Sequence, residues 1–276
     1  MARTDTLGNF LTDVADAIRE KKGTTDTILA SNFDTEIASI EGGVDINEYL
    51  SDTITNGSNS LGGWAKTVKK MRSPLTVKGT DAQYMFYRYP LNELPQLNTS
   101  NVTNMSYMFG YCNNLTTIPQ LDTSNVTNMG NMFNSCNNLT TIPQLNTSNV
   151  TNMSAMFNNC RRITTIPQLN GEKITNINYA FGNCSLLENF NGLINLGQSY
   201  STSQSANSGS YTLDLSSSTK LTEQSIINIL NNLYDIATKG CNTQTVTLGA
   251  TNLAKLTSTE GQQALASAQS KGWNVA

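Results

Sequence analysis

Four cysteines are the residues of this chain best suited to chemistry, because they recur at a fixed spacing of 24 residues: Cys112, Cys136, Cys160 and Cys184. If the repeats stack like strands about 4.8 Å apart, successive thiols lie close enough for a disulfide or metal ladder. Each cysteine, however, follows a Met-Phe pair or its equivalent on an apolar face, in a chain that we expect to fold in a reducing cytoplasm. We therefore predict a column of small buried thiols and no metal site. Cys241 has no evident role.

Catalytic chemistry finds little support among the remaining residues. The chain has no histidine, the commonest general base. Glycoside hydrolysis needs two carboxylates about 5–10 Å apart. In the repeats only Glu93 and Asp122 are candidates, and they occupy different repeat positions. No phosphate loop, nucleophile elbow or zinc spacing is present. We expect no catalytic residue, no cofactor and no enzyme.

The elements that must position these residues come from a repeat. Three nearly identical copies begin at Asn98, Asp122 and Asn146, and a decayed copy begins at Asn170. A fixed period of this length indicates one supersecondary unit stacked on copies of itself. In each copy the apolar spacing from Val to Cys, 126–136 in the second, predicts a short helix. The following Leu-Thr-Thr-Ile run predicts a short strand that ends at proline.

Two other columns recur with the cysteines. The methionines are expected to fill the core, because methionine packs irregular gaps. The asparagines of the second column are expected to form a hydrogen-bonded ladder that satisfies turn backbone: Asn104, Asn128, Asn152 and Asn176. The Asn-x-Thr triplets match a glycosylation acceptor, but turn and cap chemistry explains them better.

The string TSNVTNM-x-x-MF-x-x-C-x-x-L, at 99–115, 123–139 and 147–163, resembles the BspA-type leucine-rich repeat of bacterial surface and phage tail proteins. The fourth copy departs from it, with Gly-Glu-Lys-Ile at 171–174. The resemblance implies an α/β fold: a right-handed leucine-rich-repeat solenoid of about 24-residue coils, with strands on one face and irregular helical segments on the other. It also implies adhesion to another surface, without identifying the ligand.

The chain divides into four predicted parts. They are an N-terminal helical attachment and oligomerisation segment (1–43), a linker (44–63), the repeat solenoid (64–210) and a C-terminal leucine-rich-repeat-like cap (211–276). In the cap, we predict strands at 211–215 and 245–248 and helices at 222–237 and 258–270, and we expect residues 273–275 to close the end.

The N-terminal segment carries an apolar stripe at helical spacing: Leu7, Phe10, Leu11, Val14 and Ile18. Two helices in about forty residues rarely make an independent core, so the stripe should pack on a partner. Residues 7–33 resemble the attachment segment of tail proteins from phages of Gram-positive bacteria. This resemblance implies attachment to other virion tail proteins, and we expect a homo-oligomer.

Composition and charge restrict the partners and the location that we expect for the protein. The net charge of -3 favours neither nucleic acid nor an acidic membrane surface. No apolar leader region and no run of about 18 apolar residues is present, so we expect no membrane insertion. A virion protein made in the host cytoplasm needs no export signal, which favours a phage tail over the alternative location, the bacterial cell surface.

Differences between the copies indicate candidate positions for ligand binding. Core and turn columns hardly vary, whereas outward columns do. Tyrosine and arginine commonly carry binding energy, so the candidate contact surface is Tyr107, Tyr111, Asn131, Arg161 and Arg162. Drift at an unconstrained surface is the alternative explanation. The strand-side residues Thr116, Thr117 and Gln120, with their repeats, form a rival face.

These patterns predict a non-enzymatic phage tail or baseplate protein that uses a repeat solenoid to bind a host cell-surface protein or glycan. Two alternatives stay open. The chain could be a purely structural tail component, or a bacterial cell-surface adhesin with a missing leader.

Overall fold

The computed structural model describes residues 53–55, 75–88, 94, 96–202 and 212–276. Its strands are β1 (Thr53–Thr55), β2 (Leu75–Lys78), β3 (Leu97–Asn98), β4 (Thr165–Ile166), β5 (Leu169–Asn170), β6 (Asn189–Phe190), β7 (Leu193–Ile194), β8 (Leu213–Asp214), β9 (Gln244–Thr247) and β10 (Trp273–Val275). Its helices are α4 (Glu223–Asn231), α5 (Ala250–Leu253) and α6 (Thr259–Ser270).

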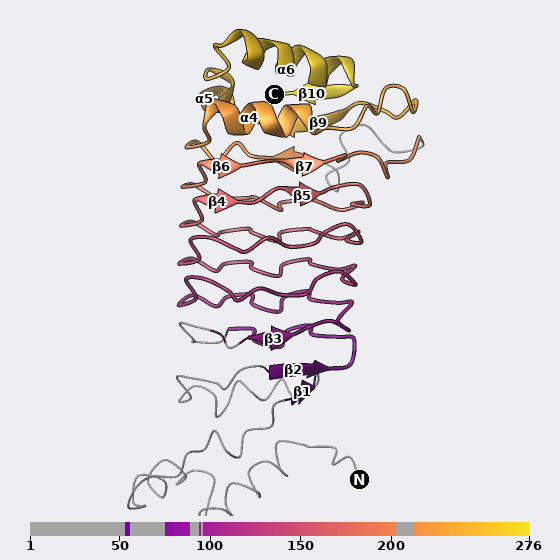
Figure 1. Cartoon of the computed structure of the whole chain (residues 1–276). Helices are drawn as coiled ribbons and strands as arrows, with labels where there is room; N and C mark the ends of the chain where they lie inside the picture. Colours follow the sequence, from indigo (N-terminus) through magenta and orange to yellow (C-terminus); the bar gives the residue numbers. More distant parts are fainter. Residues whose placement is uncertain (1–52, 56–74, 89–93, 95, 203–211) are drawn as a thin grey trace, which may run out of the picture.

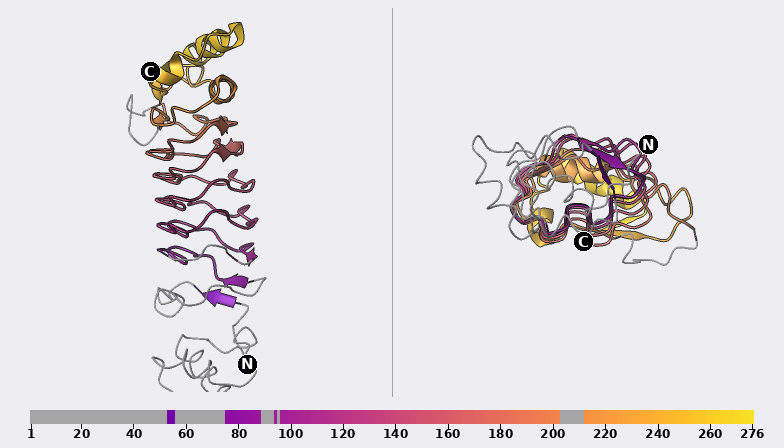
Figure 2. Two further views of the ribbon diagram at one scale, coloured as in Figure 1. Left: turned by 90° about the vertical axis from the view of Figure 1, so that its left-hand side faces the viewer. Right: turned by 90° about the horizontal axis from the view of Figure 1, so that it is seen from below.

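Successive copies of the repeat lie on one another as coils of an elongated stack (Figures 1 and 2). Parallel bridges link each coil to the next at equivalent asparagines, from Asn104 to Asn128, from Asn128 to Asn152 and from Asn152 to Asn176. The short strands pair in the same parallel sense, β4 with β6 and β5 with β7. The assignment of this stack to the right-handed leucine-rich-repeat class stays a prediction.

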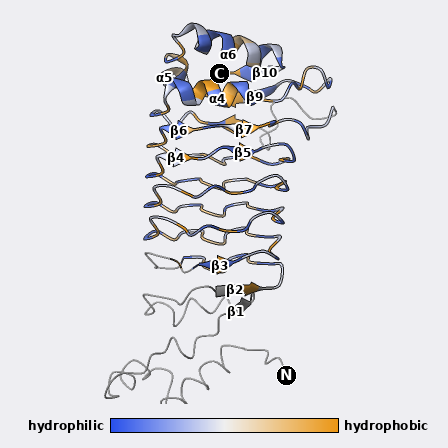
Figure 3. Cartoon of the chain, viewed as in Figure 1, coloured by the Kyte–Doolittle hydropathy of each residue, from blue (hydrophilic) through white to orange (hydrophobic). Residues whose placement is uncertain are grey.

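Each coil buries its apolar side chains, and hydrophobic and hydrophilic residues alternate along its ribbon (Figure 3). Phenylalanines form a continuous column through the core. The rings of Phe109, Phe133 and Phe157 stack with centroids 5.6 and 5.5 Å apart. Phe86 is buried 5.5 Å from Phe109, so Met85-Phe86 belongs to an earlier coil of the stack.

The segment predicted as a helix in each repeat is not one. From Met105 to Tyr111, alternate backbone N–H groups donate to carbonyls of the next coil, for example Phe109 N–H to the Met132 oxygen at 2.9 Å. Of the intervening N–H groups, those of Met108 and Gly110 close four-residue turns, as Met108 does to the Met105 carbonyl at 3.1 Å, and that of Ser106 donates to Asn104 Oδ1. An α-helix would need every donor within its own coil. We call this pattern the turn ladder.

The turn ladder requires a left-handed backbone at two positions in each coil. These residues have φ between 50° and 62°: Tyr84, Arg88, Tyr107, Tyr111, Asn131, Ser135, Ala155, Asn159, Tyr179 and Asn183. The apolar spacing misled the prediction because consecutive turns, like a helix, place one residue in three or four on the inner face.

The thiol column is buried, as predicted, and its cysteines are free. Cys136 Sγ donates to the Phe109 carbonyl at 3.0 Å, and Cys160 Sγ to the Phe133 carbonyl at 3.1 Å. Burial raises the pKa of the Cys184 thiol to about 12, and it raises the pKa of Cys136 and Cys160 well above the usual value. These protonated thiols act as hydrogen-bond donors between coils.

The predicted asparagine ladder is confirmed in part: all four asparagines satisfy turn backbone, and Asn152 and Asn128 are joined side chain to side chain. Asn152 Nδ2 donates to Asn128 Oδ1 at 3.0 Å, and Asn104 Nδ2 donates to Asp81 Oδ1 at 3.0 Å. Each Oδ1 also accepts the backbone N–H two residues later, as Asn128 Oδ1 does from Gly130 at 3.0 Å. The column therefore satisfies turn backbone and joins coils at the same time.

Helices replace turns at the C-terminal end of the stack (Figure 1). Thr222 and Ser258 cap α4 and α6 by accepting from the backbone N–H groups of Ser225 and Gly261. The predicted extension of α4 to residue 237 is wrong. The chain leaves the helix after Asn231 because Leu233 pairs with Leu196 and the Tyr234 N–H donates to the Leu196 carbonyl at 3.0 Å.

The N-terminal predictions fall largely outside the described residues. This applies to the attachment stripe of Leu7, Phe10, Leu11, Val14 and Ile18. Within the predicted linker, β1 pairs in parallel with β2. No helix in the described part of the chain is long and apolar enough to span a membrane.

Candidate binding surface

Four tyrosines from two coils pack together on the turn ladder, and with Arg88 they form what we call the tyrosine surface. Tyr84 stacks on Tyr107 with ring centroids 4.9 Å apart. Tyr87 contacts both rings edge-on, at 5.3 and 6.0 Å, and contacts Tyr111 at 5.5 Å. Edge-to-face and offset contacts of this kind add about 0.5–1.5 kcal/mol each beyond burial. The rings therefore support one another in place.

The left-handed turn positions explain why these rings stand outside the core. Tyr84 and Tyr107 occupy the first such column and Tyr111 the second. Tyr84 and Tyr111 remain 38% and 37% exposed, which is unusual for rings in mutual contact. Partial burial, and then the neighbouring tyrosines, raise the pKa of Tyr107, so its hydroxyl stays protonated and able to donate.

A cation completes the tyrosine surface. The Arg88 guanidinium carbon lies 5.2 Å from the Tyr87 ring centroid and 5.4 Å from that of Tyr111, within cation–π range. Gly110 makes room for this arrangement. A Cβ at that position would come within 3.1 Å of the Tyr87 ring, whereas the next two coils carry Asn134 and Asn158 there.

The other predicted contact residues lie elsewhere along the stack. Asn131 follows Tyr107 in its column and is half-buried, while Arg161 and Arg162 are exposed two coils beyond Tyr111. In the described residues, neither of these arginine side chains contacts an aromatic ring or a carboxylate. The structure thus joins Tyr107 to Tyr111 through Tyr87, and it does not bring the arginine pair to them.

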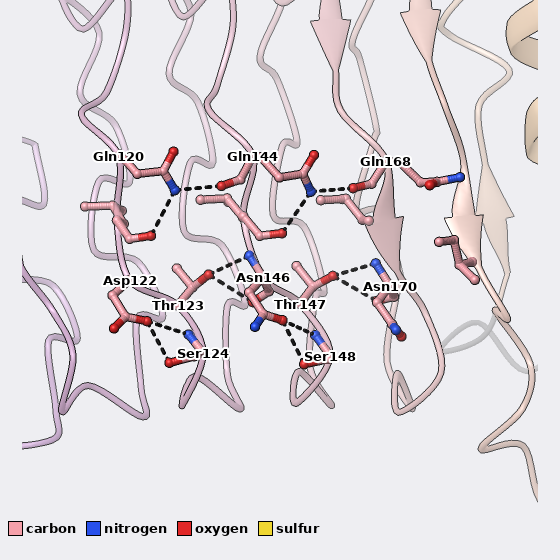
Figure 4. Close-up of a pocket in the computed structure, with 14 residues that line it drawn as sticks. Gln120, Asp122, Thr123, Ser124, Gln144, Asn146, Thr147, Ser148, Gln168 and Asn170 are labelled. Carbon is pink, nitrogen blue, oxygen red and sulfur yellow. Dashed lines mark hydrogen bonds between the residues drawn. The ribbon is translucent and has the colours of Figure 1, made fainter.

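Apart from the tyrosine surface, a groove of about 600 Å³ lies where the strand-side run turns toward the next copy (Figure 4). We call it the glutamine groove. Gln120, Gln144 and Gln168 form one edge, and the equivalent residues Asp122, Asn146 and Asn170 form the other. Leu121, Leu145 and Leu169 form a buried floor. Gln120 belongs to the rival face named from the sequence.

The repeats match a known family model. Residues 80–204 match the family described as "Mycoplasma protein of unknown function, DUF285". This range begins at the first coil of the turn ladder and ends after the fourth copy. The repeats are of the BspA type. No curated protein and no solved structure matches the chain. The match covers the tyrosine surface and the glutamine groove, but the family description names no ligand for BspA-type repeats.

Three of the five residues of the tyrosine surface were not predicted from the sequence. Tyr84, Tyr87 and Arg88 lie in the first described coil, whose Met-Phe pair precedes that of the next coil by one residue less than the period. The signal was available: Tyr84 precedes Met85-Phe86 as Tyr107 precedes Met108-Phe109. Aligning that coil on its Met-Phe pair would have placed Tyr84 over Tyr107 and Arg88 over Tyr111.

Proposed function

We propose that the protein is a non-enzymatic phage tail or baseplate protein whose right-handed repeat solenoid binds the host cell surface. The tyrosine surface is the observation that carries the binding part of the proposal. Exposed tyrosines held rigid by neighbouring rings offer contact area at low entropy cost, and an adjacent guanidinium adds directional donors. The ligand is a host cell-surface protein or glycan.

The phage setting rests on the N-terminal resemblance at 7–33, where the apolar stripe is proposed to attach the chain to other tail proteins and to form a homo-oligomer. Immunoelectron microscopy of purified virions tests this setting. Labelling at the tail supports it. Virions that lack the chain, with labelling of the bacterial surface instead, would favour the adhesin alternative.

Cell binding by the full-length fluorescent chain tests the tyrosine surface. The triple variant Tyr84→Asn, Tyr107→Asn, Tyr111→Asn removes the rings and keeps the backbone favourable, because asparagine already occupies these columns at Asn131 and Asn159. Flow cytometry on a panel of Gram-positive bacteria should show at least a roughly tenfold loss of binding, as expected for removal of several anchors.

The matched control is Tyr179→Asn, which removes a tyrosine from the same column outside the tyrosine surface, where the ring is 63% exposed. It should leave binding unchanged. A second variant, Arg161→Asn with Arg162→Asn, copies Asn137 and Asn138 of the preceding coil and tests the arginine pair separately. If wild-type chain binds no cells, the structural-component alternative is favoured. If the triple variant binds normally, the tyrosine surface is not the contact.

A further inference from the structure

Along one edge of the glutamine groove, the fold holds a regular row of glutamine amides by their nitrogen atoms. Gln120 Nε2 donates to the Leu121 carbonyl at 3.2 Å and to the Gln144 carbonyl at 2.8 Å. Gln144 Nε2 repeats the pattern, to Leu145 at 3.2 Å and to Gln168 at 2.7 Å (Figure 4). Because carbonyl oxygens can only accept, these bonds fix which end of each amide faces the backbone.

The fixed amides leave their oxygens unused. In the described residues, no hydrogen bond occupies Oε1 of Gln120, Gln144 or Gln168. All three side chains are exposed. Coils about 4.8 Å apart place these acceptors in a row about 10 Å long. One edge of the groove is therefore an evenly spaced line of preorganised acceptors.

The opposite edge is held in the same way and presents donors. Asn146 Oδ1 accepts from the Ser148 N–H at 3.1 Å and from its hydroxyl at 2.7 Å. Asn170 Oδ1 accepts from the Glu172 N–H at 2.8 Å. Both Nδ2 groups are left without a partner in the described part of the chain. Asp122 holds the same turn with one carboxylate oxygen, at 3.0 and 2.6 Å from Ser124, and its second oxygen is an additional acceptor.

We propose that the glutamine groove binds a linear, neutral, hydroxyl-rich polysaccharide that runs along the stack with about one sugar unit for each coil. A pyranose unit has nearly the length of one coil step, and each sugar hydroxyl can donate to a glutamine oxygen and accept from an asparagine amide. This inference goes beyond the proposed function, because it holds whether or not the tyrosine surface binds cells.

Charge and backbone geometry select this ligand class over others. Among the described residues that line the groove, Asp122 is the only ionisable one, so a polyanion meets no basic partner among them. An added peptide strand needs a row of free backbone groups. At this groove the Leu169 and Gly171 N–H groups already donate to the next coil, to Gly192 and Ile194 at 3.1 and 2.7 Å. Side-chain amides are what the groove offers.

Isothermal titration calorimetry with the full chain tests the proposal. The probes are four linear hexasaccharides, chitohexaose, cellohexaose, maltohexaose and xylohexaose, each at millimolar concentration beside its disaccharide. At least one hexasaccharide should bind about tenfold more tightly than its disaccharide, because it engages more than one coil. No binding by any hexasaccharide, or equal affinity for the two lengths, would overturn the proposal.

A double variant locates the bound chain. Asn146→Asp with Asn170→Asp keeps the turn-forming oxygens, as Asp122 shows in the same column, and replaces two donors by acceptors. Affinity for the bound hexasaccharide should fall about tenfold or more. The control Asn98→Asp alters the same column outside the groove lining and should bind like wild type. Equal affinity of the double variant and wild type would contradict the proposal, and thermal unfolding verifies that all three chains are folded.

Discussion

The repeat coils and the C-terminal region satisfy their backbone hydrogen bonds in opposite ways. In the turn ladder, alternate N–H groups donate to the neighbouring coil, so no coil is complete by itself. In α4 and α6 the donors are satisfied within the helix, and Thr222 and Ser258 complete the first turns. A helix can therefore end the stack without offering further unpaired backbone to another coil.

This difference explains what each region can vary. A coil must keep the groups that face its neighbours, which are the phenylalanine, cysteine and asparagine columns. Its outer left-handed positions tolerate tyrosine, asparagine, serine or alanine. The helices keep an apolar face instead, with Ile226, Ile229 and Leu230 buried in α4. Surface diversity is thus concentrated on the coils, where both candidate binding features lie.

The largest expected effect is loss of packing between coils. Phe133 stacks on Phe109 and Phe157 and is fully buried, so Phe133→Ala should lower the free energy of unfolding by about 3–5 kcal/mol. Because stacked coils depend on their neighbours, urea unfolding should also become less cooperative. The control Phe133→Leu should cost clearly less. Equal losses for the two variants would show that side-chain volume does not set the cost, because leucine restores much of the volume that alanine removes.

A smaller loss of stability should appear at alkaline pH. It should come from the buried thiols of the coils and not from the C-terminal end of the stack. The unfolded thiols ionise above about pH 8.5–9, whereas burial raises the folded pKa of Cys184 to about 12. Above pH 9 the unfolded chain therefore binds fewer protons than the folded chain, and stability must fall as pH rises toward 12. Each such thiol contributes about 1.4 kcal/mol per pH unit.

Denaturant unfolding at pH 8, 9 and 10 measures this loss. Cys184→Ala should flatten the pH dependence by one thiol's share, because the group that ionises only in the unfolded chain is gone. Cys241→Ala is the control, since that thiol is half-buried at the C-terminal end of the stack. If the stability of Cys184→Ala and that of wild type fall with the same slope as pH rises, burial does not control the pKa of the Cys184 thiol.

The sequence predicted the stacking period, the buried columns and the positions at which α4 and α6 begin, because each follows from apolar spacing or from a residue type that favours a helix N-terminus. It did not predict the turn ladder. Val126 to Cys136 has helical spacing, and only the neighbouring coil's carbonyls decide where its N–H groups donate. The tyrosine surface and the glutamine groove were only partly predicted for the same reason. Tyr84 meets Tyr107, and Gln120 meets Gln144, only across coils.

The substitution of alanine by glycine is expected to change the free energy of unfolding in opposite directions in a turn ladder and in a helix. Ala155 has φ of 50°, a conformation that costs alanine energy and glycine almost none, so Ala155→Gly should stabilise the protein by about 0.5–1 kcal/mol. Ala266 is exposed in α6, where the same change should destabilise it by about 0.5–1 kcal/mol. Urea unfolding of both variants beside wild type gives the two signs. If Ala155→Gly were destabilising like Ala266→Gly, the repeat segment would be helical in solution, as its apolar spacing first indicated. The tyrosine surface would then lose the left-handed positions that hold its rings outside the core.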